Sequence, residues 1–290
     1  MSGAWGGRCM RCYRSEGMNK RARIAFVAAL AVAGAAALLL IAPIPQPQGY
    51  HDFADQRTLF VIPRFFDVVS NAPFFILGTI ALWLLAAGRI RFVDPRERGP
   101  YAVFFLGILL TALTSAWYHL APDDARLAGD RLTMTIAFMG WLAAQIAERL
   151  GVRAGLLLLP VLLALGIGSV LYWAATEAAG RGDLRLYGFV HFYPALLIPL
   201  LLGLFPSRYS RGGDVLAVLG LYALALTAEW FDRPLFEMTG VISGHTLKHL
   251  IAALAVCWML RMLHLRRPVS PAQTSPAKSE ASSTTASYSP

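Results

Sequence analysis

The chain has 290 residues, of which 57% are hydrophobic and only 15% are charged. About a quarter of the residues of a soluble globular chain are charged, so this composition argues against a soluble domain and indicates a bundle of membrane helices. The formal net charge of +9 does not indicate nucleic-acid binding, because the Lys and Arg residues are scattered over short connections rather than gathered on a basic helix.

The start of the chain allows two interpretations. Residues 1–23 form a basic segment, and residues 24–44 form an Ala/Leu-rich run long enough to cross a bilayer. The pair also resembles a signal peptide or signal anchor, although the run is long for a signal peptide. We predict a cytoplasmic basic segment and a retained additional helix, with cleavage as the alternative. Cys9 and Cys12 form a CxxC without the second pair that a zinc ribbon needs, and we assign them no role.

Seven further apolar segments form the predicted core, which spans residues 45–264. Two of them, 132–146 and 215–228, are short and need flanking residues to complete a span. The segments are 65–87, 101–120, 132–146, 154–175, 186–205, 215–228 and 246–263. The predicted fold is therefore all-α, a polytopic membrane helix bundle with a seven-helix core and one additional N-terminal transmembrane helix. Residues 265–290, rich in Ser, Pro, Thr and Ala, are expected to be disordered.

The distribution of positive charge predicts the orientation of the spans. A cytoplasmic N-terminus places most of the 26 Lys and Arg residues on the cytoplasmic side, as positively charged loops require. An even number of spans then puts both termini in the cytoplasm. The connection 89–98 faces the same side.

Five polar residues lie near the predicted outer ends of three spans. Ser115 and His119 are four residues apart near the end of one span, and His245 and His249 are four residues apart near the start of the last. Residues at positions i and i+4 share one helical face. Asp130 lies at the start of the next predicted span, 132–146. The topology therefore places His119, Asp130, His245 and His249 at one membrane depth, where each polar residue needs a functional reason.

Three imidazoles and a water form a catalytic zinc arrangement with an open coordination position. The sequence therefore predicts Zn²⁺ bound by His119, His245 and His249. Asp130 would hold or deprotonate the water, and Ser115 would stabilise the developing oxyanion. The alternative is that the histidines only form hydrogen bonds between helices.

The same residues resemble the alkaline ceramidases, which belong to the CREST superfamily of seven-helix membrane hydrolases together with the progestin and adipoQ receptors. The resemblance covers roughly residues 50–263. The motifs that carry it are Phe66-Asp-Val-Val-Ser-Asn71, Ser115-Ala-Trp-Tyr-His119, Asp130-Arg-Leu-Thr-Met134 and His245-Thr-Leu-Lys-His249. It implies a zinc-dependent intramembrane amidase, which hydrolyses a ceramide-like membrane lipid to a sphingoid-type base and a fatty acid.

The resemblance also bears on calcium. Animal ceramidases of this type carry a calcium site built from acidic residues before and within the first core helix. Alignment on Ser70 and Asn71 puts Arg64 where an acidic ligand is expected. We therefore expect zinc-dependent but calcium-independent activity, with Arg64 paired with Asp52 or Asp55 in place of the ion.

Two other functions stay open. One is a lipid-sensing, receptor-like member of the same superfamily with little turnover, and the other is a proton-coupled transporter whose histidines relay protons. Against the transporter, no paired Gly/Pro-interrupted helices indicate an inverted repeat. His191 is expected to form a hydrogen bond between helices. Glu229 and Asp232, at the end of the 215–228 span, are expected to be solvated in the loop, with a position at the mouth of the cavity as the alternative.

Overall fold

The computed structural model describes residues 18–269. The described part of the chain is built of helices joined by short connections. They are α1 (Lys20–Ala37), η1 (Leu38–Leu40), η2 (Gln48–His51), α2 (Phe65–Val69), α3 (Ala72–Ala86), η3 (Pro95–Glu97), α4 (Arg98–Leu120), α5 (Asp124–Arg149), α6 (Val152–Ala178), α7 (Arg185–Leu204), α8 (Gly213–Trp230), α9 (Asp232–Thr239) and α10 (Gly244–Leu265). Residues 1–17, with Cys9 and Cys12, and residues 270–290 of the predicted disordered tail lie outside this description.

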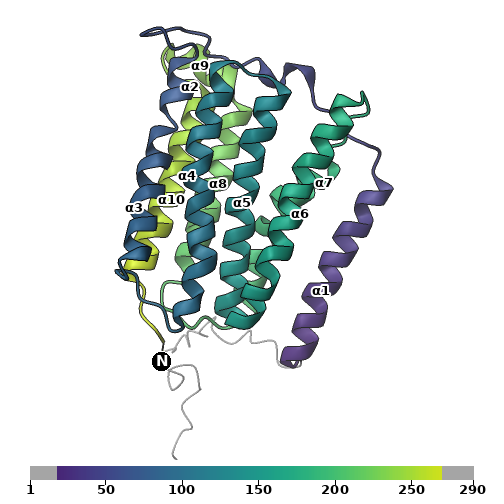
Figure 1. Cartoon of the computed structure of the whole chain (residues 1–290), viewed down its shortest axis with the longest axis vertical. Coiled ribbons are helices and arrows are strands. Elements are labelled where there is room, and N and C mark those ends of the chain that lie inside the picture. The colour runs from purple at the N-terminus through teal and green to yellow at the C-terminus, as the bar shows by residue number, and fades with distance from the viewer. Residues whose placement is uncertain (1–17, 270–290) are drawn as a thin grey trace, which may run out of the picture.

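The long helices stand side by side as a bundle, with α1 at one edge, where it contacts α7 (Figure 1). Seven helical stretches are long and apolar enough to cross a membrane: α1 with η1, α2 with α3, η3 with α4, and α6, α7, α8 and α10. The prediction of an all-helical, multi-pass membrane protein is therefore confirmed. The long helix α5 coincides with a predicted span but is not among the seven, because charged residues lie towards both of its ends. The count of eight spans stays a prediction.

The helix bounds follow the sequence pattern except at one break. The two short segments gain the expected flanking residues, as α5 and α8. The segment 65–87, however, is two helices, α2 and α3, which meet at Ser70 and Asn71. Their side chains donate back to the carbonyl of Asp67, and Pro73 in the first turn of α3 has no N–H to donate. The break places Ser70 against α10.

Glycines set the distance between α4 and α5. A Cβ atom on Gly107 would lie 2.5 Å from the backbone nitrogen of Ala137, and one on Gly140 would lie 2.7 Å from that of Phe104. Small residues at such points let membrane helices approach closely, where packing rather than the hydrophobic effect holds them together. The two helices that carry Ser115, His119 and Asp130 are thus fixed against each other.

A network of ion pairs closes the end of the bundle opposite the start of α10. Glu97 pairs with Arg208, and Glu148 pairs with Arg266, the residue that follows α10. Arg266 is only 5% exposed, and the Val269 N–H donates to the carbonyl of Arg208. The first residues of the predicted tail are therefore ordered, because Arg266 supplies the charge that buried Glu148 needs.

The described chain starts and finishes at the same end of the bundle, whereas the end of α4 and the start of α10 lie at the other (Figure 1). This arrangement gives a test of the predicted sidedness. Arg96, in η3, and Asp123, after α4, lie at opposite ends of α4. In intact cells we expect a membrane-impermeant thiol reagent to label Asp123→Cys but not Arg96→Cys, both made in a Cys-free background. The reverse pattern contradicts the orientation.

Candidate metal centre

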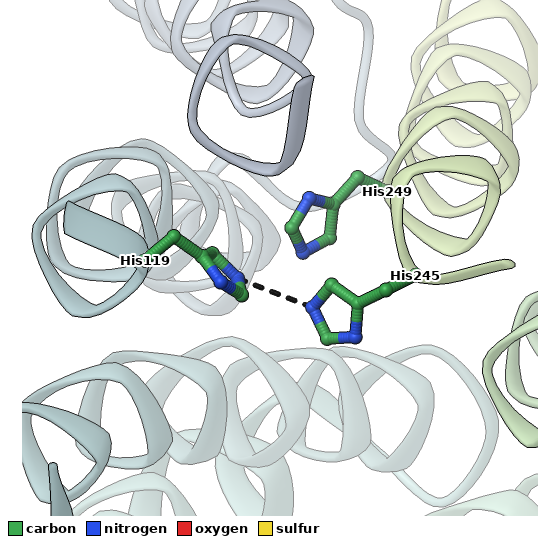
Figure 2. A group of neighbouring side chains, drawn as sticks. All are labelled: His119, His245 and His249. Carbon is green, nitrogen blue, oxygen red and sulfur yellow. Dashed lines mark hydrogen bonds between the residues drawn. The ribbon is translucent and has the colours of Figure 1, made fainter. Parts of the chain in front are cut away.

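Three histidine rings meet between the end of α4 and the start of α10 (Figure 2). The Nε2 atoms of His119 and His245 lie 3.1 Å apart. One nitrogen from each of the three rings, His249 included, lies within 4.8 Å of the other two, as ligands of a single metal ion must. The residues are 1%, 4% and 5% exposed. The prediction that these three residues meet is confirmed, and the group they form could hold a metal ion.

The start of α10 is held against α8 and α9, which positions His245. Ser243 caps α10. A Cβ atom on Gly244 would lie 2.1 Å from the carbonyl oxygen of Ala228, so only glycine permits this approach. The backbone N–H of His245 donates to the Asp232 carboxylate at 2.8 Å. One helix terminus is thereby tied to its neighbours immediately beside the metal-binding group.

Two of the rings have a polar partner at the nitrogen that faces away from the group. His249 Nδ1 lies 2.8 Å from Ser70 Oγ, and His245 Nδ1 lies 3.4 Å from Glu229 Oε1. Ligating histidines commonly donate their second N–H in this way, which fixes the tautomer and leaves the Nε2 lone pair for the metal. Among the described residues, His119 Nδ1 has no such partner. The donor set therefore fits a divalent metal such as zinc.

Glu229 and Asp232 correct the sequence interpretation, because neither is solvated in a loop. Glu229 accepts from Lys248 Nζ at 2.6 Å and faces His245. Asp232 accepts from the backbone N–H groups of Ala54 and His245. Both residues lie at the predicted outer end of their span, at the same membrane depth as the histidines. That shared depth was the sequence signal for a role beside the metal-binding group.

Asp67 joins α2 to the start of α10. Its side chain is fully buried, and its Oδ1 accepts from the hydroxyls of Thr246 at 2.6 Å and Ser243 at 3.2 Å. Together with the Ser70–His249 contact, these hydrogen bonds hold α2 beside the metal-binding group. The segment from Phe66 to Asn71 was one of the motifs that carry the resemblance, but no role was predicted for Asp67 or Ser70.

A cavity of about 590 Å³ adjoins the histidine group at His249. Ser115, Asp130 and His249 all line it, so the structure brings the predicted catalytic residues to one space. The Oδ1 atom of Asp130 has no hydrogen-bond partner in the described structure. Most other lining residues are apolar, among them Leu38, Ile41, Phe74, Met134, Phe189 and Leu226. The cavity thus presents polar groups at one place and hydrocarbon-compatible walls around them.

Two side chains hold the walls of this cavity together. Arg185, at the start of α7, donates to the carbonyl oxygens of Leu38 and Ile41, which fixes the segment after α1 over the cavity. His191 bonds to the hydroxyls of Tyr187 and Tyr222, and so joins α7 to α8. The prediction that His191 bonds between helices is therefore confirmed.

The expected pairing of Arg64 is wrong. Asp55 pairs with Arg57 at 2.7 Å and Asp52 with Arg233 at 3.0 Å. Although burial alone would raise the pKa of Asp55, the hydrogen bonds from Arg57 hold it below its usual value. Arg64 has a left-handed backbone, φ 46°, at the start of α2 and donates instead to the carbonyl of His119 at 3.3 Å. It thus satisfies one of the free carbonyls at the end of α4.

Comparisons of this chain with protein-family models, curated proteins and solved structures gave no match. The class of protein is therefore defined by the fold and the site alone. The chain is an all-helical, multi-pass membrane protein with three buried histidines grouped beside a cavity.

Ser70→Ala is expected to weaken metal binding by about 10- to 100-fold, because His249 then loses the partner that orients its ring. Zinc affinity, measured by competition with a chromogenic chelator, checks this. Thr79→Ala is the control, since Thr79 is exposed on α3 and its hydroxyl bonds only to Phe75 of its own helix. Equal zinc affinity in Ser70→Ala and wild-type protein would show that the contact does not support the ligand.

Proposed function

We propose that this protein is a zinc-dependent intramembrane amidase that hydrolyses the N-acyl bond of ceramide-like lipids to a sphingoid-type base and a fatty acid. One observation carries the proposal. Three buried histidines meet beside a largely apolar cavity that also presents Asp130 and Ser115. A lipid amide requires both an apolar space for its chain and a polar centre for its carbonyl.

His119, His245 and His249 would hold the zinc ion. Neutral imidazoles are ordinary zinc ligands, and three of them leave a fourth position open. When bound, zinc polarises a carbonyl and lowers the pKa of a coordinated water towards neutrality. Glu229 and Ser70 would keep two of the ligands in the required tautomer.

Asp130 and Ser115 would handle the protons and the developing charge. Water adds to the amide carbonyl, and the Asp130 carboxylate takes the proton that the water loses. The Ser115 hydroxyl donates to the oxygen that becomes negative. The C–N bond then breaks, and Asp130 returns the proton to the leaving amine, so the products are a carboxylic acid and a free amine. The apolar walls hold the acyl chain.

Metal analysis and lipid mass spectrometry test the proposal together. Protein purified in detergent is expected to contain about one zinc per chain and to release fatty acid from one or more members of a panel of N-acyl lipids. Zinc without turnover on any amide lipid would favour the lipid-sensing alternative. Activity or transport without a metal at the three histidines would favour the proton relay and refute the amidase.

Activity is expected to depend on zinc but not on calcium. A calcium site needs several oxygen ligands, usually with more than one carboxylate. Here Asp52 and Asp55 each have an Arg partner, and Arg64 donates to the end of α4. Hydrolysis measured across a calcium titration, after treatment with a chelator selective for calcium over zinc, is expected to stay constant. A rise in rate with added calcium would contradict this.

A further inference from the structure

Arg131 follows Asp130 on α5 and lines the same cavity. The residue is buried, with 5% exposed. Three aromatic rings surround the guanidinium: its carbon lies 4.2 Å from the ring centre of Trp173, 4.7 Å from that of Tyr187 and 5.3 Å from that of Tyr50. Cation–π contacts with rings from α6, α7 and η2 therefore fix the position of this charge.

Arg131 forms no direct ion pair within the described residues, and the Asp130 carboxylate, which also lines the cavity, interacts with its charge only at longer range. Arg131 takes part in none of the described residues' ion pairs within 4.0 Å, and its buried Nη1 has no hydrogen-bond partner. The other cations that line the cavity are paired, Lys248 with Glu229 at 2.6 Å and Arg185 with Asp183 at 2.7 Å. Arg131 therefore differs from both in having unused donors.

A buried permanent charge is costly unless a counter-charge accompanies it. The donors of an Arg side chain form a planar fork that matches the two oxygens of a carboxylate, phosphate or sulfonate. The cavity around Arg131 is otherwise mainly apolar and suited to a hydrocarbon chain. These three points indicate a ligand that combines an oxyanion with a long chain.

We propose that Arg131 binds the oxyanion group of an acidic lipid whose hydrocarbon chain occupies the cavity. This site needs no turnover and is independent of the metal. Its consequence for catalysis rests on the proposed function: if the protein is an amidase, its preferred substrate is an acidic N-acyl lipid rather than an uncharged ceramide.

A pair of amide-free probes tests binding without any dependence on hydrolysis. Hexadecyl phosphate and hexadecanol have the same chain and differ in the oxyanion. From the shift of the thermal unfolding midpoint with probe concentration in detergent, we expect the phosphate to bind wild-type protein on the order of 10- to 100-fold more tightly, since one charged hydrogen-bonded contact is gained. Equal affinities would overturn the proposal, as would equally tight binding of inorganic phosphate, which lacks the chain.

Three variants assign any preference to Arg131 itself. Arg131→Gln is expected to abolish the preference for the phosphate while hexadecanol affinity and zinc content stay unchanged. Arg126→Gln, five residues earlier on α5 and outside the cavity lining, is expected to keep the preference, as a control for general charge effects in the micelle. A preference that survives in Arg131→Gln would show that the guanidinium is only a structural cation held by its three rings. Arg131→Lys, which keeps the charge, is expected to retain part of the preference and serves if the Gln variant does not fold.

A second pair of lipids connects binding to catalysis. Ceramide 1-phosphate is expected to be hydrolysed with a higher kcat/KM than ceramide of the same acyl chain, and Arg131→Gln is expected to reverse or abolish that ratio. If neither lipid is hydrolysed while the probe preference persists, the amidase is refuted and the acidic-lipid site stands. If both lipids are hydrolysed without any preference in wild-type protein, the proposed preference for an acidic substrate is refuted and the amidase stands.

Discussion

His245→Ala is expected to remove most of the zinc from the purified protein and to lower zinc affinity by more than about 100-fold, beyond the typical loss from one outer-sphere partner. The ring centre of His245 lies 4.7 Å from that of each of the other two histidines, whose own ring centres are 5.2 Å apart. Its loss leaves two ligands on separate helices and an incomplete coordination sphere. Zinc content by mass spectrometry, normalised to protein, is the measurement.

His264→Ala is the matched control, because His264 lies on the same helix, is exposed, and is far along the chain from the group. It is expected to retain zinc at the wild-type level. Wild-type zinc content in a variant that lacks all three of His119, His245 and His249 would refute the metal centre.

Asp130→Asn is expected to keep zinc but to lower hydrolysis by about 10²- to 10⁴-fold, the usual contribution of a general base. The amide has nearly the shape of the carboxylate but cannot accept the proton. Asp124→Asn, on the exposed first turn of α5, is the control. Turnover rate and zinc content are measured on the same preparations.

Ser115→Ala is expected to cost less than Asp130→Asn, because a single hydrogen-bond donor to the oxyanion is lost while the metal remains. Undiminished turnover in Asp130→Asn would remove Asp130 from the mechanism.

Helical periodicity explains why the metal centre was predictable. Two histidines at i and i+4 share a face, and the alternation of spans brings the end of α4 and the start of α10 to the same end of the bundle. His119, His245 and His249 follow from those two facts. Asp130 follows in the same way, although α5 begins six residues earlier, at Asp124.

The parts that the sequence did not predict depend on contacts outside the helical pattern. The break at Ser70 arises from local side-chain bonds to Asp67, and it alone brings Ser70 to His249. The partner of Arg64 was misassigned because Arg57, only two residues from Asp55 along the chain, donates to both oxygens of the Asp55 carboxylate. Periodicity gives faces and depths, but it does not give the geometry of an irregular loop.

The composition of α5 has a consequence for how the protein is assembled. Of its 26 residues, 16 are buried, among them Asp130, Arg131 and Glu148. Charged groups of this kind make insertion of an isolated helix into lipid unfavourable. In the finished bundle the same groups face protein instead, and Gly107 and Gly140 bring α4 within backbone contact. For α5 as the predicted additional span, we therefore expect entry into the membrane as a hairpin with α4, so that the helix supplying the proposed base depends on a neighbouring helix during synthesis.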